Sequence, residues 1–376
     1  MTLGDPVGVG PEVALRAVRD LVVEARRRGE RAPAHVVLIG DAEATRETIE
    51  RLGLAIELEP TSPDELARHL AAQPGAKDAG ARSGRARSAR TRGALRLPLV
   101  APDAALARPL RARERRPGKP SVAAAHVAYG SIRRAVELAQ AGLVDGICTA
   151  PISKEWLDRA GVASTGHTEI LAELTRSDVR LMMAYRDELR VVLATTHLAL
   201  RDVPRALTVD GIRDTILITA RHLERWFGIA RPRVAVCALN PHASDGGVYG
   251  DEEARIIAPA IARARAARVD AFGPVPADTL FSAIGPRHDA VVAMYHDQGL
   301  IPVKQLDVHH TVNVTLGLPF IRTSPDHGTA YDLAGRGTAD PRSMRAALDM
   351  ALTLARIERR ARASSGRSHR RSAPAA

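Results

Sequence analysis

The stretch Asp289-Ala-Val-Val-Ala-Met-Tyr-His296-Asp297-Gln298-Gly299 indicates the class of fold. Residues 290–295 form a short apolar run bounded by charged residues, which is typical of a strand buried on both faces of a sheet. His296, Asp297 and the flexible Gly299 then fall where we expect this strand to give way to a loop. Because ligands of open α/β sheets bind beyond the carboxyl ends of the strands, we expect a functional site here.

Two earlier apolar runs, residues 190–197 and 234–242, also end in a histidine. If the three strands are parallel neighbours, His197, His242 and His296 converge on one edge of the sheet. Three imidazoles and an open position are typical of a catalytic divalent metal, with zinc favoured and cobalt or manganese as alternatives. Each histidine taken alone is more often a hydrogen-bonded structural residue than a metal ligand, and the three in the same context favour the metal.

Strand and helix patterns alternate along most of the chain, so we predict an α/β fold. Strands are expected at 35–40, 146–150 and 311–316, and helices at 11–29, 121–141 and 342–362. The glycine- and proline-rich loop 4–12 fits neither a P-loop nor a Rossmann fingerprint, although its backbone amides suit an anion.

Two further loops are candidates for the site. The loop 151–154, which ends in Lys154, follows the strand expected at 146–150. His167 and Thr168 precede a helix expected at 170–174, where free backbone amides favour an anion or a carboxylate. The alternative for the second loop is structural, with Thr168 capping the helix and Glu169 favouring its dipole.

The net charge of +11 suggests nucleic-acid binding, but its distribution argues against that function. The excess of Lys and Arg lies in residues 77–119 and 356–371, and the rest of the chain is mildly acidic. Neither basic segment carries the aromatic side chains that stack on bases, so we expect no specific nucleic-acid partner.

Other bulk properties narrow the class of protein. At 376 residues, the chain is long enough for two domains. We find no apolar run that could cross a bilayer and no N-terminal signal segment, so we expect no membrane contact. Cys148 and Cys237 lie in expected strands without CxxC spacing, which favours two core residues in a reducing cytoplasm.

Many ordered motifs together resemble the 4-hydroxythreonine-4-phosphate dehydrogenases of vitamin B6 biosynthesis. The resemblance covers about residues 2–75 and 118–360. The matching motifs are Gly4-Asp-Pro-Val-Gly-Val-Gly-Pro-Glu12, Thr149-Ala-Pro-Ile-Ser-Lys154, Gly166-His-Thr-Glu169, Thr195-Thr-His-Leu198, Leu239-Asn-Pro-His242, Pro276-Ala-Asp-Thr-Leu280, Tyr295-His-Asp-Gln-Gly299 and Leu316-Gly-Leu-Pro-Phe-Ile-Arg-Thr-Ser324.

The resemblance implies two α/β/α domains with a cleft between them, as in isocitrate and isopropylmalate dehydrogenases. We expect the first domain at 1–148 plus 305–376, and the second, with the dimer interface, at 149–304. The resemblance also implies NAD as oxidant, with NADP as the alternative, and zinc, cobalt or magnesium as the metal. His197, His242 and His296 match the family's metal ligands, in a site shared across a homodimer.

Further site residues carry over from the same resemblance. Substrate contacts match His167, Thr168, Lys304, Asn313 and Arg322. The segment containing His327, Gly328, Thr329, Asp332 and Gly335 is similar to the adenosine-binding loop of the isocitrate dehydrogenases, and a helix-capping turn is the alternative. Asp278, Asp297 and Lys304 are candidates for the catalytic base.

The implied reaction oxidises the C3 hydroxyl of 4-phosphooxy-L-threonine by hydride transfer to NAD. The resulting 3-oxo acid then loses CO₂ to give 3-amino-2-oxopropyl phosphate. Sibling activities on erythronate or threonate 4-phosphate, or on an aromatic-acid cis-dihydrodiol, remain alternatives. An alternative of another class is a metal-binding or basic interaction protein without turnover.

The sequence departs from the family's pattern at two places. Met1 stands almost on the first glycine-proline loop, so we expect either a mis-assigned start or a truncated first strand with a weakened sheet edge. Residues 76–117 are rich in Ala, Arg, Gly and Ser, which predicts a mobile insertion, although 95–100 suit an edge strand. Residues 363–376 are expected to form a disordered tail.

Overall fold

The computed structural model describes residues 1–30, 36–71, 94–163, 166–282, 285 and 287–371, with side chains as far as Ser364. Its strands are β1 (Leu38–Ile39), β2 (Ile56–Pro60), β3 (Leu95–Val100), β4 (Gly146–Cys148), β5 (Arg180–Tyr185), β6 (Leu189–Leu193), β7 (Arg233–Cys237), β8 (Asp270–Val275), β9 (Ala290–Ala293), β10 (Thr311–Leu316) and β11 (Ile321–Pro325). Its α-helices are α1 (Gly10–Arg27), α2 (Ala42–Arg51), α3 (Pro63–Ala71), α4 (Val122–Gln140), α5 (Lys154–Arg159), α6 (His167–Thr175), α7 (Val203–Ala206), α8 (Val209–Arg225), α9 (Ala258–Ala266), α10 (Ala277–Leu280), α11 (His296–Leu306) and α12 (Arg342–Arg371).

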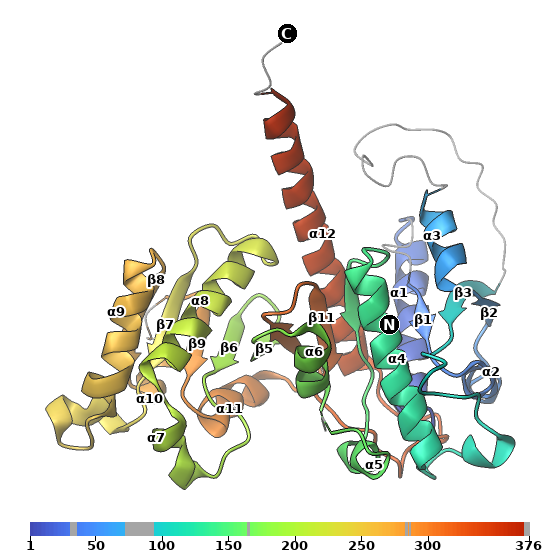
Figure 1. Cartoon of the computed structure of the whole chain (residues 1–376), viewed down its shortest axis with the longest axis horizontal. Helices are drawn as coiled ribbons and strands as arrows, with labels where there is room; N and C mark the ends of the chain where they lie inside the picture. The colour runs from blue at the N-terminus through green and yellow to red at the C-terminus, as the bar shows by residue number, and fades with distance from the viewer. Residues whose placement is uncertain (31–35, 72–93, 164–165, 283–284, 286, 372–376) are drawn as a thin grey trace.

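Two sheets organise these elements. The larger has the strand order β4-β11-β10-β5-β6-β9-β7-β8, and the smaller has the order β1-β3-β2. Pairing is parallel except where β10 meets β5 and β11 and where β5 meets β6. Helices cover both faces, so the predicted α/β class is confirmed. Figure 1 shows α1–α6 with β1–β3 in one half and α7–α11 with β6–β9 in the other.

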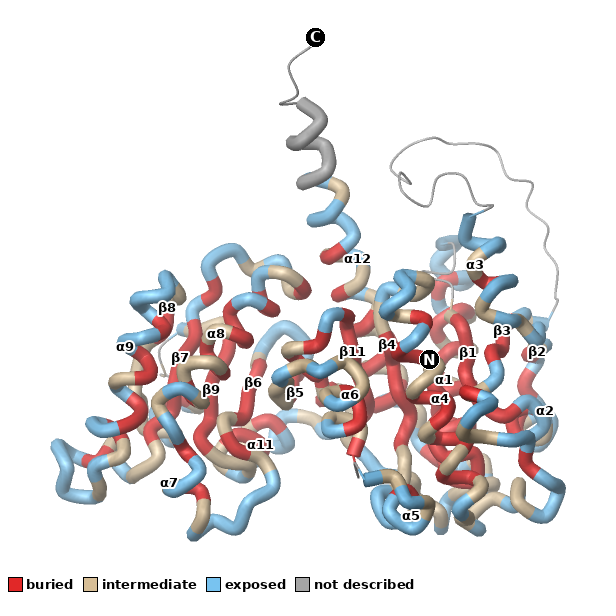
Figure 2. Tube along the Cα trace, in the orientation of Figure 1, coloured by how far each residue is buried: buried red, intermediate tan, exposed pale blue. Residues whose placement is uncertain are grey.

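The hydrophobic core divides in the same way. Val312, Val314 and Ile321 pack with residues of α1 and α12, whereas Val191 and Val291 pack with residues of α11. Buried positions are concentrated on the strands of both halves (Figure 2). Helices α5 and α6 pack on α4 of the first half, although the sequence grouped them with the second. The domain boundaries themselves stay a prediction.

The N-terminal segment lies between the two sheets. Thr2 forms parallel bridges to Ile39 and to Thr149, with hydrogen bonds from Thr2 N to Cys148 O (3.0 Å) and from Ala150 N to Thr2 O (3.1 Å). The segment therefore joins β1 and the end of β4, which are edge strands of the two sheets, and the weakened sheet edge stays a prediction.

The prediction of a mobile insertion is wrong for residues 94–117. Strand β3 pairs with both β1 and β2, so it is the central strand of the small sheet and not an edge strand. Leu97, Leu99 and Val100 are buried there, and this burial outweighs the biased composition. Residues 76–93 lie outside the described residues.

Two predicted boundaries and the predicted flexibility of Gly299 also need correction. Helix α12 continues to Arg371, because Ala, Arg and Ser are compatible with a helix, and Figure 1 shows its end projecting from the body. His296 begins helix α11 rather than a loop. Gly299 is not a flexible point, since a Cβ there would lie 2.7 Å from the Leu193 side chain, where α11 packs closely on β6.

Candidate active site

The histidine rim, by which we mean His197, His242 and His296, lies at the carboxyl ends of three adjacent strands. Strand β9 pairs in parallel with β6 on one side and with β7 on the other. The prediction that the histidine strands are parallel neighbours is therefore confirmed. His197 follows β6, His242 follows β7 and His296 follows β9.

Two side chains tie these strand ends together. The Thr195 hydroxyl donates to Met294 O (2.7 Å). The Gln298 side chain accepts from Met294 N (2.7 Å) and donates to Ala238 O (2.6 Å). Since these bonds join the ends of β6, β9 and β7, the backbone that carries the rim is held by side chains to which the sequence analysis assigned no role.

His197 and His296 lie next to each other, with ring centroids 5.8 Å apart. The Nδ1 atom of His296 is 2.7 Å from Asp297 Oδ1, which leaves its Nε2 available to a ligand. Burial, with Lys154 and His296 nearby, lowers the pKa of His197 and keeps it neutral. A neutral imidazole beside a carboxylate-oriented imidazole is a donor set that fits a divalent metal.

His242 occupies a strained turn after β7. Its φ is 53°, and Ala243, Ser244 and Asp245 also have positive φ between 46° and 70°. Each non-glycine residue in this region costs of order 1–3 kcal/mol, so the surroundings must hold the turn. The buried Glu253 carboxylate anchors the start of the turn, accepting from Leu239 N (2.8 Å), Asn240 N (2.7 Å) and Asn240 Nδ2 (2.9 Å), and Ser244 Oγ within the turn donates to Gly250 O (2.7 Å).

The described residues of one chain do not bring the whole rim into one cluster. His242 lies with its ring 6.4 Å from that of Tyr249, and no three His, Cys, Asp or Glu side chains of the described part form a group able to hold a metal. A cavity of about 580 Å³ nevertheless joins His242 to Asp297, the neighbour of His296, and to Asp278. Two of the three predicted catalytic residues thus share one cavity with His242.

A second polar cluster, which we call the anion pocket, consists of Arg322, His167 and Asn313. It lies on the face of the sheet opposite α12, since Thr323, the neighbour of Arg322 on β11, donates to Ala347 O of α12. Arg322 is 1% exposed and has no carboxylate partner among the described residues. Its guanidinium donates to Thr149 Oγ1 (2.8 Å) and to Thr315 Oγ1 (3.0 Å). Burial lowers the pKa of Arg322 to about 10, which still leaves it charged at neutral pH.

Two more predicted substrate residues complete the anion pocket. His167 has a buried Nε2 without a partner, and Asn313 has a buried Oδ1 without a partner. Burial, and secondarily the charge of Arg322, hold the pKa of His167 well below its usual range. Because a hydrogen bond to the Ala150 backbone uses the other ring nitrogen, Nε2 of the neutral ring is an acceptor. Unpaired buried polar atoms beside an unpaired arginine indicate a polar, anionic ligand.

Thr168 and Lys304 flank this pocket on two different helices. Gly166 is the N-cap of α6, which places Thr168 in the first turn and rules out the alternative that it caps the helix. Lys304 projects from α11 and pairs with Asp326 at 3.0 Å, just beyond β11. The structure thus brings residues of α6 and α11 toward the strands that carry Asn313 and Arg322.

The predicted nucleotide loop follows Asp326 directly. His327 and Asp332 are exposed, and Thr329 lies against the first glycine-proline loop, where Val9 N donates to Thr329 O (2.9 Å). Gly335 has φ +82°, and a Cβ there would lie 2.7 Å from Pro117. Gly328 is exposed, whereas Gly335 is half-buried at the end of the turn 331–335.

Comparison with known proteins identifies the family to which the chain belongs. The family model of the pyridoxal phosphate biosynthetic protein PdxA matches residues 32–351. The chain belongs to the PdxA family. It is therefore an oxidoreductase of pyridoxal phosphate biosynthesis.

Individual relatives agree with this assignment to the PdxA family. The 4-hydroxythreonine-4-phosphate dehydrogenase of Geobacter metallireducens is 44% identical, with 95% of each chain covered. The same enzyme from Klebsiella pneumoniae has a solved structure with a TM-score of 0.75, at 37% identity and with 94% of this chain and 96% of that one covered. A terephthalate 1,2-cis-dihydrodiol dehydrogenase from Burkholderia xenovorans LB400 matches with a TM-score of 0.61, 27% identity and 94% and 96% coverage.

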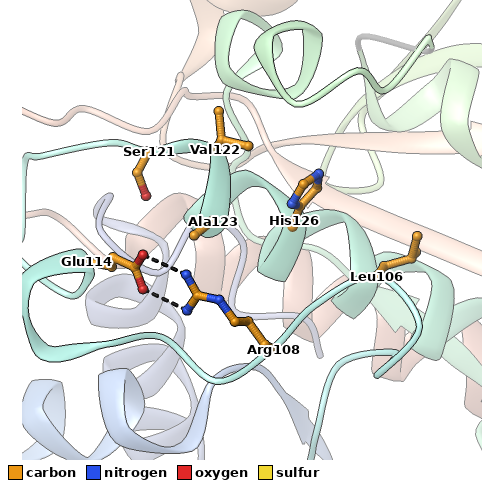
Figure 3. A pocket seen from close by; sticks show the side chains of 7 residues that line it. All are labelled: Leu106, Arg108, Glu114, Ser121, Val122, Ala123 and His126. Atoms are coloured by element: carbon orange, nitrogen blue, oxygen red, sulfur yellow. Dashed lines mark hydrogen bonds and ion pairs between the residues drawn. The ribbon is translucent and has the colours of Figure 1, made fainter.

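A separate cavity of about 410 Å³ contains none of the predicted PdxA-family site residues. It is lined by Arg108, Glu114, Ser121 and His126 among others, at the start of α4 (Figure 3). Arg108 donates to both oxygens of Glu114, at 2.8 and 2.7 Å, so its charge is already neutralised. This cavity is therefore not a second anion pocket.

Several functional side chains of this PdxA-family chain were missed from the sequence. Thr149 and Thr315 hold Arg322, Asp326 holds Lys304, and Glu253 holds the His242 turn. Thr315 gave one usable signal, since Asn313 and Thr315 alternate with apolar residues on β10 and therefore share a face. Glu253 gave none, because its partner Asn240 lies on another element.

Proposed function

We propose that this chain catalyses the NAD-dependent oxidation of 4-phosphooxy-L-threonine, with NADP as the alternative oxidant. The 3-oxo product then loses CO₂ to give 3-amino-2-oxopropyl phosphate. The observation that carries the proposal is the anion pocket, in which Arg322 is 1% exposed and forms no ion pair with any carboxylate of the described residues. A buried, unpaired guanidinium is costly, and an anionic substrate relieves that cost.

The residues of the anion pocket bind and orient the substrate. Arg322 offers a planar fork to a phosphate or carboxylate, and Lys304 adds a point charge once it leaves Asp326. The neutral His167 accepts a hydrogen bond from the substrate at Nε2, and Asn313 accepts one at Oδ1. Thr168, in the first turn of α6, supplies a hydroxyl.

We assign the divalent metal, with zinc favoured over cobalt or magnesium, to the histidine rim. His197 and His296 hold it from one chain, and Asp297 orients His296 through Nδ1. When bound, the ion lowers the pKa of the substrate hydroxyl and stabilises the charge that develops during loss of CO₂. Asp278, Asp297 and Lys304 are the candidates to accept the hydroxyl proton.

We further propose that the enzyme is a homodimer and that His242 completes the metal site across the interface. Large apolar side chains are exposed close in sequence to His197 and His242 and along or just after α11: Leu198, Leu200, Val248, Tyr249, Ile301, Leu306 and Val308. Such a concentration of exposed apolar side chains is typical of an interaction surface. A symmetric partner would cover it and bring a second His242 close to His197 and His296.

We place NAD on the loop that contains His327, Gly328, Thr329, Asp332 and Gly335. We also place the enzyme in the cytoplasm, where reducing conditions suit the buried free cysteines Cys148 and Cys237. No helix in the described part of the chain has the length and apolar character needed to span a membrane.

A turnover assay tests this function. Purified protein loaded with zinc is mixed with NAD and 4-phosphooxy-L-threonine, and NADH is followed by its absorbance. We expect the amino acid to be oxidised at least tenfold faster than erythronate 4-phosphate or a terephthalate cis-dihydrodiol. Faster oxidation of either comparison substrate would reassign the substrate, and no oxidation of any of them would overturn the proposal.

A further inference from the structure

The first helix and the loop before it contact the predicted nucleotide loop along its length. Tyr331 Oη donates to Asp5 Oδ2 (2.7 Å), and Val9 N donates to Thr329 O (2.9 Å). Farther along α1, the Glu12 carboxylate accepts from Gly335 N. Residues separated by more than three hundred positions in the sequence therefore form one hydrogen-bonded unit.

Arg16 extends these contacts one turn further along α1. Its guanidinium donates to Ala339 O (3.2 Å) and to Gly337 O, so it binds two carbonyls of the segment that follows the predicted nucleotide loop. Gly337 has φ +69°, a conformation that its neighbours must maintain. A charged donor that satisfies two backbone acceptors is well suited to fix such a turn.

Close backbone approach reinforces the contacts. A Cβ on Gly8 would lie 3.0 Å from Thr329 O, and a Cβ on Gly118 would lie 2.7 Å from Tyr331 O. Gly118 N also donates to Val7 O (2.8 Å). The loop is thus enclosed by residues 5–16 on one side and by residues 117–118 on the other, which limits the conformations it can adopt.

Two carboxylates of residues 5–16 are buried beside the predicted nucleotide loop. Asp5 is 1% exposed and Glu12 is 2% exposed. Oε2 of Glu12 is buried and has no partner, although its Oε1 accepts from Gly335 N. Burying two acidic groups without an ion pair is unfavourable unless their hydrogen bonds serve a specific arrangement.

We propose that residues 5–16 are a positioning platform for the nucleotide loop, with Asp5, Glu12 and Arg16 fixing the conformation in which the loop binds the adenosine part of NAD. This inference rests on the proposed function, because it assumes that the loop binds NAD. The platform acts on cofactor affinity and leaves the anion pocket, on β10 and β11, unchanged. A platform that served only the stability of the fold would affect both ligands equally.

The chain offers a matched pair of variants to test this proposal. Arg16→Met removes the two bonds to the loop, whereas Arg19→Met removes an arginine on the same helix that pairs with its neighbour Asp20. Tyr331→Phe removes the bond to Asp5 independently. Each is compared with the unchanged full-length protein by NADH fluorescence titration and by hydrogen exchange of peptides that cover 327–339.

We expect Arg16→Met and Tyr331→Phe each to weaken NADH binding by about tenfold, since a charge-assisted or buried hydrogen bond contributes that much. Exchange in 327–339 should increase, and the affinity for 4-phosphooxy-L-threonine should stay within twofold. Arg16→Lys, which can still reach one carbonyl, should recover part of the affinity. Arg19→Met should match the unchanged protein in every measurement.

The possible outcomes separate this proposal from the proposed function. Unchanged NADH affinity in Arg16→Met and Tyr331→Phe, or an equal loss for NADH and substrate, overturns the platform. If the unchanged protein binds NADH but oxidises none of the tested substrates, the proposed function fails and the platform is still judged by the NADH affinities. An unchanged protein that binds neither NADH nor NADPH overturns both.

Discussion

The anion pocket and the histidine rim occupy the same sheet but differ in how complete they are. In the pocket, Arg322 is 1% exposed and donates hydrogen bonds to Thr149, which directly follows β4, and to Thr315 of β10 in the same chain. On the rim, the side chain of His296 is 38% exposed and His242 lies apart on a strained turn. The pocket is thus preformed within one chain, whereas we expect the rim to need a metal and a second copy.

This difference shows how binding and chemistry can be separated in one protein. A preformed anion site positions the substrate by hydrogen bonds that fold with the core. An exposed rim can form part of an interface, and its geometry is then determined only on assembly. We therefore expect substitutions in the two regions to affect different measured quantities.

The largest effect is expected from Arg322→Met. Loss of the buried guanidinium removes two charge-assisted contacts to the substrate, so kcat/KM should fall by about 1,000-fold, or ~4 kcal/mol. The free energy of unfolding should not decrease, because the variant no longer buries an unpaired charge. The control is Arg359→Met. This variant removes an ion pair with Asp145 at the surface, where the Arg359 side chain is 60% exposed. Comparable losses of activity in both variants would remove the distinction between pocket and surface.

The next effect is expected from His296→Ala at the rim. Zinc affinity, measured with a competing chelator, should fall by at least about 100-fold, and Asp297→Asn should cost about tenfold by disturbing the orientation of His296. Because His296 is partly exposed, the unfolding free energy of the metal-free protein should change by less than about 0.5 kcal/mol. Full zinc binding by His296→Ala would contradict the role of the rim.

A smaller effect is expected from Tyr249→Lys on the surface next to His242. Tyr249 is 51% exposed and Val248 is 71% exposed, so the substitution should leave the fold intact. A lysine in the apolar interface should shift the protein toward a monomer in sedimentation experiments and lower NADH production by about tenfold. If the unchanged protein is a monomer with full activity, the rim is complete within one chain and the comparison fails.

The smallest effect concerns pH and the buried His167. Its pKa is held well below the usual range by burial and then by Arg322. As pH falls below about 6.5, His167 binds a proton in the unfolded chain but stays neutral in the folded one. The free energy of unfolding therefore decreases by up to about 1.4 kcal/mol per pH unit. Urea unfolding at pH 7, 6 and 5 should therefore show a flatter dependence for His167→Gln than for the unchanged protein. Identical slopes would place His167 in a solvated environment.

Several features could be predicted because they depend on local patterns. The apolar runs before His197, His242 and His296 indicated buried strands, and the structure pairs those strands in parallel. Strand β10 was predicted with its observed bounds, Thr311–Leu316. Elsewhere the local signal misled, as for β3, whose buried leucines stand beside a basic low-complexity stretch.

The sequence by itself determined the α/β class, the three histidine strands and the family, because side-chain periodicity and short motifs are properties of consecutive residues. Only the tertiary structure decided that Arg322 contacts Thr149, that Glu253 holds the His242 turn, and that α1 contacts the 327–339 segment. These contacts join residues far apart in the chain. They depend on the order in which strands pair and helices pack, and no local pattern encodes that order.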